Sequence, residues 1–280
     1  MRMSKTAARF ISILLIIGAV MGTLPVSVFA QTLENKKNAD VYRNNLLNNV
    51  VKSEEKAEIV AEVIEKREEY TKTYERADGT FTKVISKTPL HNRVENDWND
   101  IDNSLVKNGN IIKNSNGVFS VEFPEVISED KSISLEVDGQ SIAFALNGVS
   151  QAQAAVSENI SADDDSNDII LRELGKTISE IIYSEAANGT DIQYIVSPNT
   201  LKENIIIKNK ASLKKSYAFE IEKGSLRVES DGQNGILLKN AENETVFTIP
   251  APVMTDASGA VSYEIETRIE NAGENVFNLT

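Results

Sequence analysis

The sequence predicts a mainly β protein: an antiparallel β-sandwich-like domain preceded by a signal peptide and a short helical leader. Apolar and polar residues alternate over many short stretches beyond about residue 77, and pairs of turn-forming residues separate these stretches. The opening of the chain instead combines a basic start with an apolar run. We therefore divide the chain into a signal peptide (1–30), a helical leader (31–76) and an antiparallel β-rich domain (77–280).

The first thirty residues have the three parts of a signal peptide. Three basic residues open the chain: Arg2, Lys5 and Arg9. An apolar run extends from Phe10 to Val20, and Val28 and Ala30 supply the small side chains that a signal peptidase accepts. An uncleaved membrane-spanning helix is the alternative, which Pro25 disfavours. We expect cleavage after Ala30 and a product that is secreted or associated with the cell wall.

The leader is predicted to contain two helical stretches. Residues 39–52 place apolar side chains at four-residue intervals, and Ser53 is a suitable N-cap for a second stretch over 53–70. The apolar stripe of this second stretch is narrow and consists of Ala57, Val60, Ala61 and Ile64. The leader is either a surface helix that packs on the β domain or a mobile segment.

Short alternating stretches and turns predict the strands of the β domain. Residues 133–137 and 142–146 form the two arms of a hairpin around Asp138-Gly139, because both turn residues tolerate positive φ. Further alternating sets end or begin at turns of the same kind: Phe119, Val121 and Phe123; Ile192, Tyr194 and Val196 after Asn188-Gly189; Tyr217, Phe219 and Ile221; Ile236 and Leu238; Val261, Tyr263 and Ile265. This recurrence is typical of an antiparallel sandwich.

Residues 150–168 show no periodic pattern of apolar residues and predict a long surface loop that joins two sheet segments, either within one sandwich or between two lobes. Within it, Asp163, Asp165 and Asn167 occupy the first three ligand positions of a calcium-loop pattern. The pattern then fails, because Asp168 replaces the required glycine and Leu174 replaces the required glutamate. A solvated acidic loop is the main interpretation, and Ca²⁺ binding is the alternative.

Charge and composition exclude several classes of function. The predicted signal peptide holds three of the 29 basic residues and no acidic residue, so the remaining chain has a formal charge of −16, against −13 for the whole sequence. This charge repels nucleic acids and anionic membrane surfaces. The chain has no cysteine and one histidine, His91, so thiolate chemistry and histidine-rich metal sites are excluded. We therefore expect no enzymatic activity, no catalytic residue and no obligatory cofactor.

The tryptophan of the chain marks the strongest candidate for sugar binding. Trp98 is flanked by Asp97 and Asp100, and aromatic rings beside carboxylates bind carbohydrates in many proteins. A glycosidase would need only two suitably spaced carboxylates, but with 42 acidic residues such a pair carries no information. The competing interpretation is that Trp98 packs and the aspartates form turns. Tyr194, on a predicted strand, is a further candidate for ligand contact if its ring is exposed.

Four phrases of the sequence resemble a known family. They are DGTFTKVISKTPLHNRVENDWNDIDNSL (78–105), NGVFSVEFP (116–124), GTDIQYIVSPNTLKENIII (189–207) and TVFTIPAPVMTDASG (245–259). Together they resemble the N-terminal β-rich region of bacterial RHS or YD-repeat wall-associated proteins and of DNRLRE-domain surface proteins. The resemblance implies a β module without catalytic residues, followed in such proteins by repeats and a variable effector. This chain has neither repeat type, which suggests a truncated product.

Two functions therefore remain. The first is a structural or scaffold module of a wall-associated surface protein, whose partners are the downstream repeats of a parent protein. The second is a carbohydrate- or cell-wall-binding module that contacts cell-wall polysaccharide through exposed aromatic side chains such as Trp98, Tyr183 or Tyr194. A glycoside-active enzyme is the third and weakest reading.

Overall fold

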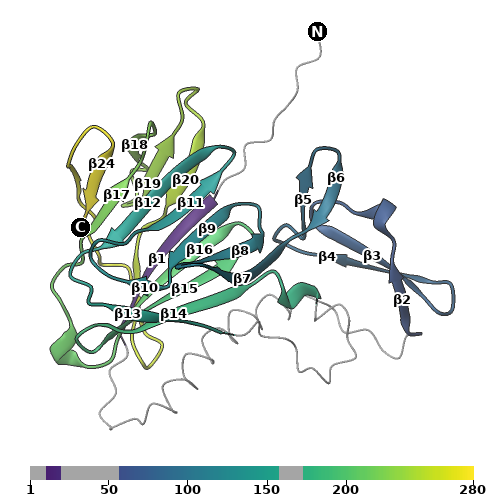
Figure 1. The fold of residues 1–280 in the computed structure, drawn as a ribbon, viewed down its shortest axis with the longest axis horizontal. Helices are drawn as coiled ribbons and strands as arrows, with labels where there is room; N and C mark the ends of the chain where they lie inside the picture. The colour runs from purple at the N-terminus through teal and green to yellow at the C-terminus, as the bar shows by residue number, and fades with distance from the viewer. Residues whose placement is uncertain (1–10, 20–56, 158–172) are drawn as a thin grey trace.

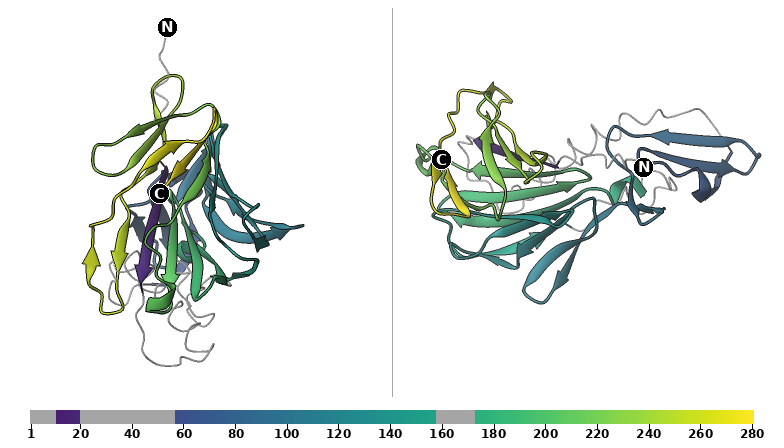
Figure 2. Two further views of the ribbon diagram at one scale, coloured as in Figure 1. Left: turned by 90° about the vertical axis from the view of Figure 1, so that its left-hand side faces the viewer. Right: turned by 90° about the horizontal axis from the view of Figure 1, so that it is seen from above.

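The protein is a β-sandwich with a smaller β lobe beside it. The computed structural model describes residues 11–19, 57–157 and 173–280. Figure 1 shows two large sheets that face each other, and a lobe of five strands at one side of them. The views of Figure 2 show the same arrangement from the side and from above, with the lobe extending away from the sandwich. The mainly antiparallel β fold that the sequence predicts is confirmed.

In the described part of the chain, the first sheet consists of nine strands in one hydrogen-bonded order and two short strands beside them. Its hydrogen-bonded order is β10 (Val126–Ile127), β13 (Ala152–Val156), β14 (Ser179–Ala187), β15 (Thr190–Ser197), β16 (Thr200–Ile207), β1 (Ile11–Ala19), β20 (Thr245–Ile249), β19 (Ile236–Lys239) and β18 (Arg227–Ser230). Two short strands extend it, because β21 (Val253–Thr255) pairs with β1 and with β22 (Val261–Ser262). The pairs from β13 to β16 are antiparallel, whereas β1 runs parallel to β16, β20 and β21.

The second sheet is antiparallel wherever a pairing joins its strands. Its order is β23 (Ile269–Asn271), β24 (Val276–Leu279), β17 (Phe219–Glu222), β12 (Gln140–Leu146), β11 (Ile133–Val137), β9 (Ser120–Pro124), β8 (Ile111–Asn116) and β7 (Asp102–Asn108). The predicted Asp-Gly hairpin joins β11 and β12, with Leu135 opposite Ile142. Asp138 and Gly139 both have positive φ, 49° and 75°, as a tight hairpin turn requires.

The core of the sandwich lies between the two sheets and is centred on aromatic rings. The ring of Tyr194 lies 5.4 Å from that of Phe123, 6.2 Å from that of Phe144 and 6.3 Å from that of Tyr183. All four side chains are buried, and aliphatic residues of both sheets surround them. The alternating positions that the sequence assigns to strands at 119–123, 133–146 and 192–196 therefore point into this core, as predicted.

The smaller lobe consists of two small sheets and a short helical turn. One sheet holds β2 (Ile59–Glu62), β3 (Thr71–Arg76) and β4 (Phe81–Ile85); the other holds β5 (His91–Val94) and β6 (Asp97–Asp100). A 3₁₀ turn, η1 (Ile64–Lys66), lies between β2 and β3, and a second one, η2 (Lys210–Ser212), follows β16 in the sandwich. The apolar core of the lobe is small, with Tyr74, Val84 and Leu90 buried and Leu174 packed against them.

Three sequence-based expectations are wrong where the structure describes them. The predicted helix over 53–70 is replaced by β2 and η1 from Ile59 to Lys66, because β2 pairs with β3 and tertiary pairing outweighs a narrow amphipathic stripe. The predicted loop 150–168 begins with strand β13, which pairs with β10 and β14. The alternation at 261–265 forms only the two-residue strand β22, and Tyr263 is 75% exposed.

The predicted signal peptide and first leader helix lie mostly outside the described residues. Of the signal peptide, Ile11–Ala19 is described, and it forms β1 rather than a helix. Residues 31–56 are outside the described part of the chain. Within the described ranges, the structure contains no helix with the length and apolar character to span a bilayer. Removal of residues 1–30 stays a prediction.

Packing of the aromatic core predicts a large effect of one truncation. Phe123 is wholly buried, and its replacement by alanine (Phe123→Ala) should lower the free energy of unfolding by about 3–5 kcal/mol. Val106 of β7 is 51% exposed, so Val106→Ala should change the free energy of unfolding by less than about 0.5 kcal/mol. Urea unfolding followed by circular dichroism compares the two variants, and equal midpoints would contradict the assigned core.

Candidate functional site

A cluster of charged side chains joins the two small sheets of the lobe. Arg67 donates from Nε and Nη2 to the two carboxylate oxygens of Glu62, at 2.9 and 2.7 Å. Its Nη2 also lies 2.7 Å from Oδ2 of Asp100, and its Nη1 donates to the backbone carbonyl of Trp98 at 3.0 Å. Lys72 forms an ion pair with Oδ1 of Asp100 and lies 3.9 Å from Oε2 of Glu173. One guanidinium and one ammonium therefore bridge β2, β3 and β6.

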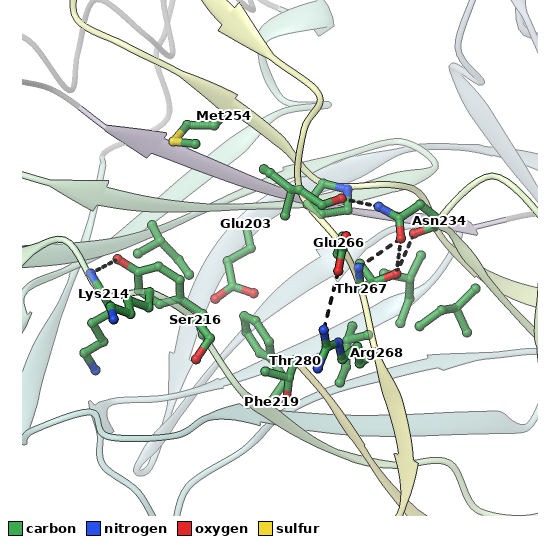
Figure 3. A pocket seen from close by; sticks show the side chains of 18 of the residues that line it. Glu203, Lys214, Ser216, Phe219, Asn234, Met254, Glu266, Thr267, Arg268 and Thr280 are labelled. Carbon is green, nitrogen blue, oxygen red and sulfur yellow. Dashed lines mark hydrogen bonds and ion pairs between the residues drawn. The ribbon is translucent and has the colours of Figure 1, made fainter.

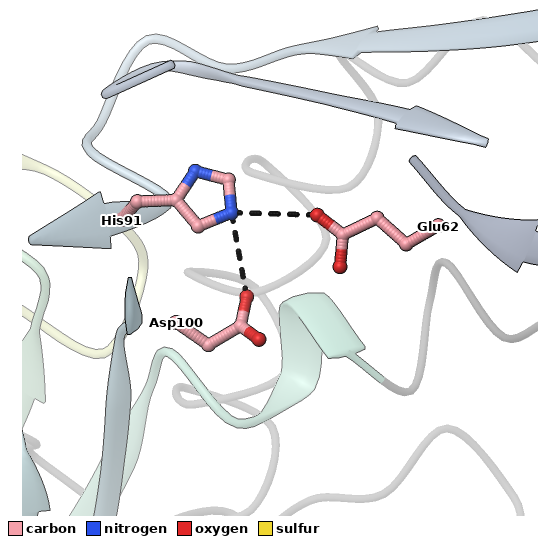
Figure 4. A group of neighbouring side chains, drawn as sticks. All are labelled: Glu62, His91 and Asp100. Atoms are coloured by element: carbon pink, nitrogen blue, oxygen red, sulfur yellow. Dashed lines mark ion pairs between the residues drawn. The ribbon is translucent and has the colours of Figure 1, made fainter. Parts of the chain in front are cut away.

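His91 lies at the centre of this cluster and is shown in Figure 4 with its two acidic neighbours. Its Nε2 is 3.6 Å from Oε1 of Glu62 and 3.4 Å from Oδ1 of Asp100, and its side chain is fully buried. Its Nδ1 lies 2.7 Å from the backbone oxygen of Glu68, which fixes the orientation of the ring. The sequence placed these residues far apart and did not predict this grouping.

The three side chains have the geometry of a metal-ligand set, but the charges around them favour another role. Donor atoms of Glu62, His91 and Asp100 all lie within 4.8 Å of one another. The same carboxylates, however, are already paired with Arg67 and Lys72, whose side chains are only 11% and 6% exposed. A divalent cation would meet two buried positive charges there. The cluster is therefore best described as a buried ion-pair network.

The carboxyl group of Asp100 has a strongly shifted pKa. Burial alone would raise this pKa, but the neighbouring His91 ring, the Lys72 ammonium and the positive charge of Arg67 outweigh burial and lower it well below the usual value. The carboxylate is therefore ionised throughout the physiological range. A permanently charged, cation-paired aspartate holds elements together rather than exchanging protons with a substrate.

The sequence-predicted sugar site is only partly assembled. Trp98 is half-buried on β6, directly opposite Arg93 of β5, whose guanidinium carbon lies 5.6 Å from the ring centroid. Asp97 is exposed, whereas Asp100 belongs to the buried network. The three residues therefore do not converge on one surface. Asp163, Asp165 and Asn167 of the calcium pattern lie outside the described residues.

Tyr194 does not have the exposed ring that the predicted ligand contact requires. Its side chain is completely buried between the sheets, and its hydroxyl donates to Oε1 of Glu203 at 3.1 Å. Tyr183, the other tyrosine proposed for an exposed platform, is also completely buried and donates to the carbonyl of Pro124 at 2.5 Å. Alternation correctly predicted that Tyr194 is on a strand, but it cannot tell which face of a strand meets another sheet.

A cavity of about 520 Å³ opens at the end of the sandwich near β24. Figure 3 shows its walls, which come from both sheets and from the segments 213–217 and 264–268. Apolar side chains of five strands line its interior: Ile205, Phe219, Ile236, Ile249 and Leu279. Ionisable side chains lie among and around them, including Glu203, Arg268 and Glu266. The size and the mixture of apolar walls and few polar groups are those of a ligand- or side-chain-binding pocket.

Asn234 holds one rim of this cavity in place. Thr267 donates from its backbone nitrogen to Oδ1 of Asn234 at 2.9 Å, and its hydroxyl donates to the Asn234 carbonyl at 2.9 Å. The side-chain nitrogen of Asn234 donates to the carbonyl of Ile265. Asn234 has a φ of 71°, a left-handed conformation that asparagine tolerates better than most residues. The rim segment 264–268 is thereby tied to the turn before β19.

Glu203 is the unusual polar group in the cavity wall. It is fully buried, and burial raises the pKa of its carboxyl to about 8, against an opposing effect of the hydrogen bond from Tyr194. Its Oε2 has no hydrogen-bond partner among the described residues. A signal for this site was present in the sequence, because Glu203 interrupts the inward-facing apolar alternation of Leu201, Ile205 and Ile207. A neutral buried carboxyl group can donate one hydrogen bond to an occupant of the cavity.

Comparisons with known proteins find one relative named as a wall-associated protein and others named as tRNA nucleases. A wall-associated protein of Geobacillus stearothermophilus is 29% identical over 202 residues, which are 70% of this chain and 75% of that protein. The tRNA3(Ser)-specific nuclease WapA of Bacillus spizizenii is 22% identical over 96% of this chain and 12% of that protein. The tRNA(Glu)-specific nuclease WapA of Bacillus subtilis subsp. natto is 21% identical over 94% of this chain and 12% of that protein. No protein-family model and no solved structure matches the chain.

These similarities support part of the resemblance inferred from the sequence and correct another expectation. The likeness to wall-associated proteins is confirmed, whereas the RHS-repeat and DNRLRE features stay predictions. The expectation that the chain has no enzymatic activity is overturned, because relatives that match nearly its whole length are named tRNA nucleases. The chain spans three quarters of one relative but only 12% of these nucleases.

The ion-pair network predicts different effects for two aspartates of the same strand. Asp100→Ala would leave Arg67 and Lys72 without their shared partner, and it should lower the free energy of unfolding by about 2–3 kcal/mol. This value is below that of a wholly buried pair, because the Asp100 side chain is 39% exposed. Asp97→Ala, at an exposed position, should change the free energy of unfolding by less than about 0.5 kcal/mol. Similar urea midpoints for both variants would count against the network.

The raised pKa of Glu203 predicts a pH dependence of stability. Between its ordinary pKa of 4.5 and about 8, the folded state keeps a proton that the unfolded state has lost. The stability that this carboxyl supports is therefore present below pH 4.5 and is lost as pH rises, by up to about 1.4 kcal/mol per pH unit. Glu203→Gln should remove this slope while keeping an acceptor for Tyr194. Urea unfolding at pH 5, 6, 7 and 8 measures how the free energy of unfolding depends on pH. The same dependence in the unmodified chain and in Glu203→Gln would contradict the raised pKa of Glu203.

Proposed function

We propose that the chain is an exported N-terminal module of a wall-associated, RHS-type surface protein, and that it holds this protein at the cell wall. The observation that carries the proposal is the similarity to a wall-associated protein over 70% of this chain and 75% of that relative. The predicted signal peptide supports export.

The names of the longer relatives support a shared carrier role for this region. Two relatives are named for different tRNAs, yet each matches nearly the whole chain at 21–22% identity and over 12% of its own length. A region common to nucleases with different named targets is not expected to select the target. This pattern supports the proposal that target choice lies in other parts of such proteins and that this module has a shared role.

The smaller lobe offers a surface for wall polysaccharide, which is the second candidate function. Six of its large apolar side chains are exposed: Val60, Ile64, Tyr70, Phe81, Ile85 and Val94. Among them, Phe81 is 53% and Tyr70 is 43% exposed, and Lys66 places its ammonium 4.2 Å from the centroid of the Phe81 ring. Exposed aromatic rings with adjacent hydrogen-bond donors are the usual means of holding sugars. This lobe therefore replaces the buried Tyr194 as the candidate contact surface.

Sedimentation of the secreted chain with isolated cell walls tests the proposal. Saturable pelleting is expected. If the lobe provides the contact, Phe81→Ala should weaken pelleting about tenfold or more, because an anchoring aromatic side chain contributes on the order of 1.4 kcal/mol or more. Tyr263→Ala, on the sandwich and 75% exposed, is the matched control and should pellet like the unmodified chain.

Two outcomes of the sedimentation assay distinguish wall attachment by the module from sugar contact by the lobe. No pelleting of a chain that unfolds cooperatively would refute wall attachment by this module. Pelleting that Phe81→Ala leaves unchanged would keep the carrier role and reject the lobe as the contact surface. A chelator added to the same assay tests whether pelleting needs Ca²⁺, for which residues 163–167 carry part of a calcium-loop pattern. A tRNA cleavage assay on the same preparation measures whether the chain shares the activity in the names of its relatives.

A further inference from the structure

One strand of the first sheet comes from the predicted signal peptide. Figure 1 shows β1, in purple, between β16 and β20. It pairs in parallel with β16 over eight residues, from Ser12 opposite Thr200 to Ala19 opposite Ile207. It also pairs with β20 at Ile11 and Ser12 and with β21 from Ile16 to Gly18. No other strand described in this structure connects β16 to β20.

Removal of residues 1–30 would open the middle of this sheet. The strands β10 to β16 would end at an unpaired edge of β16, and β18 to β20 would end at an unpaired edge of β20. Because adjacent strands lie about 4.8 Å apart, the space between these two edges has the width of one strand. We call this space the β1 slot. Unpaired backbone donors and acceptors along both of its edges favour pairing with another strand.

The inner side of the β1 slot is apolar and already contains a cavity. The inward-facing residues of β16 and β20 are buried, with Leu201, Ile205 and Phe247 at most 2% exposed. Residues of β16, β20 and β21 line the 520 Å³ cavity described above, including Ile249 and Met254. Side chains on alternate positions of a strand in the slot would therefore point toward this cavity.

We propose that the β1 slot is an acceptor site for an extended, apolar peptide strand of about nine residues, supplied by a partner polypeptide and bound parallel to β16. Backbone hydrogen bonds to β16 and β20 would supply affinity, and side chains entering the cavity would supply selectivity. The proposal rests on the proposed function, because export with loss of residues 1–30 is what empties the slot.

The occupant is defined by the strand that now fills the slot. The segment ISILLIIGA is nine residues long, uncharged and mostly apolar, and its pairing direction is parallel. A parallel strand cannot reach its neighbour through a tight hairpin, so it must come from a distant or a separate segment. Relatives of which this chain spans only 12% contain a large amount of additional polypeptide, so proteins of this kind have enough chain to supply such a strand to a partner.

A binding experiment with the secreted chain tests the slot directly. The probe is a fluorescent synthetic peptide with the sequence of residues 11–19, flanked by two lysines at each end for solubility. Mass spectrometry of the secreted chain first establishes that residues 1–30 are absent. We expect saturable 1:1 binding in fluorescence anisotropy. At about 100 times the dissociation constant, the peptide should raise the melting temperature by about 5–10 °C.

Two controls test whether the peptide enters as a strand. The full chain produced in the cytoplasm keeps residues 1–30 and therefore has a filled slot, so it should bind at least about tenfold more weakly. A peptide with methylated backbone nitrogens at alternate residues loses its donors along one edge and should also bind at least about tenfold more weakly. Charge and length are unchanged in this second peptide, so non-specific apolar binding would not distinguish it.

Several outcomes would overturn the proposal. The first is a cooperatively folded secreted chain that does not bind the peptide, which would mean that the two edges close on each other. The second is equal binding to the chain that retains residues 1–30. The third is a dimer of the secreted chain that the peptide does not displace, because a second copy would then fill the slot. The fourth is retention of residues 1–30 after secretion, because the slot would then stay filled. Sedimentation with cell walls tests the proposed function separately, so its result does not depend on any of these four outcomes.

Discussion

Tyr194 lies where the two sheets of the sandwich meet, and aromatic side chains of three other strands surround its ring. Phe123 and Phe144 come from the second sheet, and Tyr183 comes from the first. Each tilted or edge-to-face contact of this kind adds about 0.5–1.5 kcal/mol beyond the burial of apolar area. The hydroxyl of Tyr194 also satisfies one oxygen of Glu203, so the same side chain fixes the sheet spacing and the buried carboxyl in the cavity wall.

The smaller lobe is stabilised in a different way. Its apolar core has only three buried side chains, too few to hold two small sheets by the hydrophobic effect alone. The ion pairs of Arg67 and Lys72 connect strands of both sheets, and Glu173 and Leu174 bring the chain before β14 into contact with them. Asn103 continues this link, because its side chain donates to the carbonyl of Thr177 at 2.8 Å. The lobe is therefore joined to the sandwich by polar contacts that require both partners in place.

The cavity, the β1 slot and the exposed lobe suggest that the sandwich and the smaller lobe make different contacts. The sandwich contains the cavity beside which we propose a peptide strand to bind, and the lobe presents apolar side chains on its outside. Under the proposed function, the module would have to contact both the wall and the protein that it carries. The two surfaces come from separate sheets, so substitution of one need not disturb the other.

The sequence by itself determined the mainly β class, the Asp138-Gly139 hairpin and the inward-facing residues of β9, β11, β12 and β15, because alternation and turn chemistry are local properties. It also carried the likeness to wall-associated proteins. Only the tertiary structure decided that Tyr194 is buried, that residues 59–66 form a strand and a turn, and that Glu62, His91 and Asp100 meet. Each of these depends on which strand becomes a neighbour of which, and residues far apart in the chain set that choice. The same reason hid the β1 slot, since local patterns do not show which strands flank a segment.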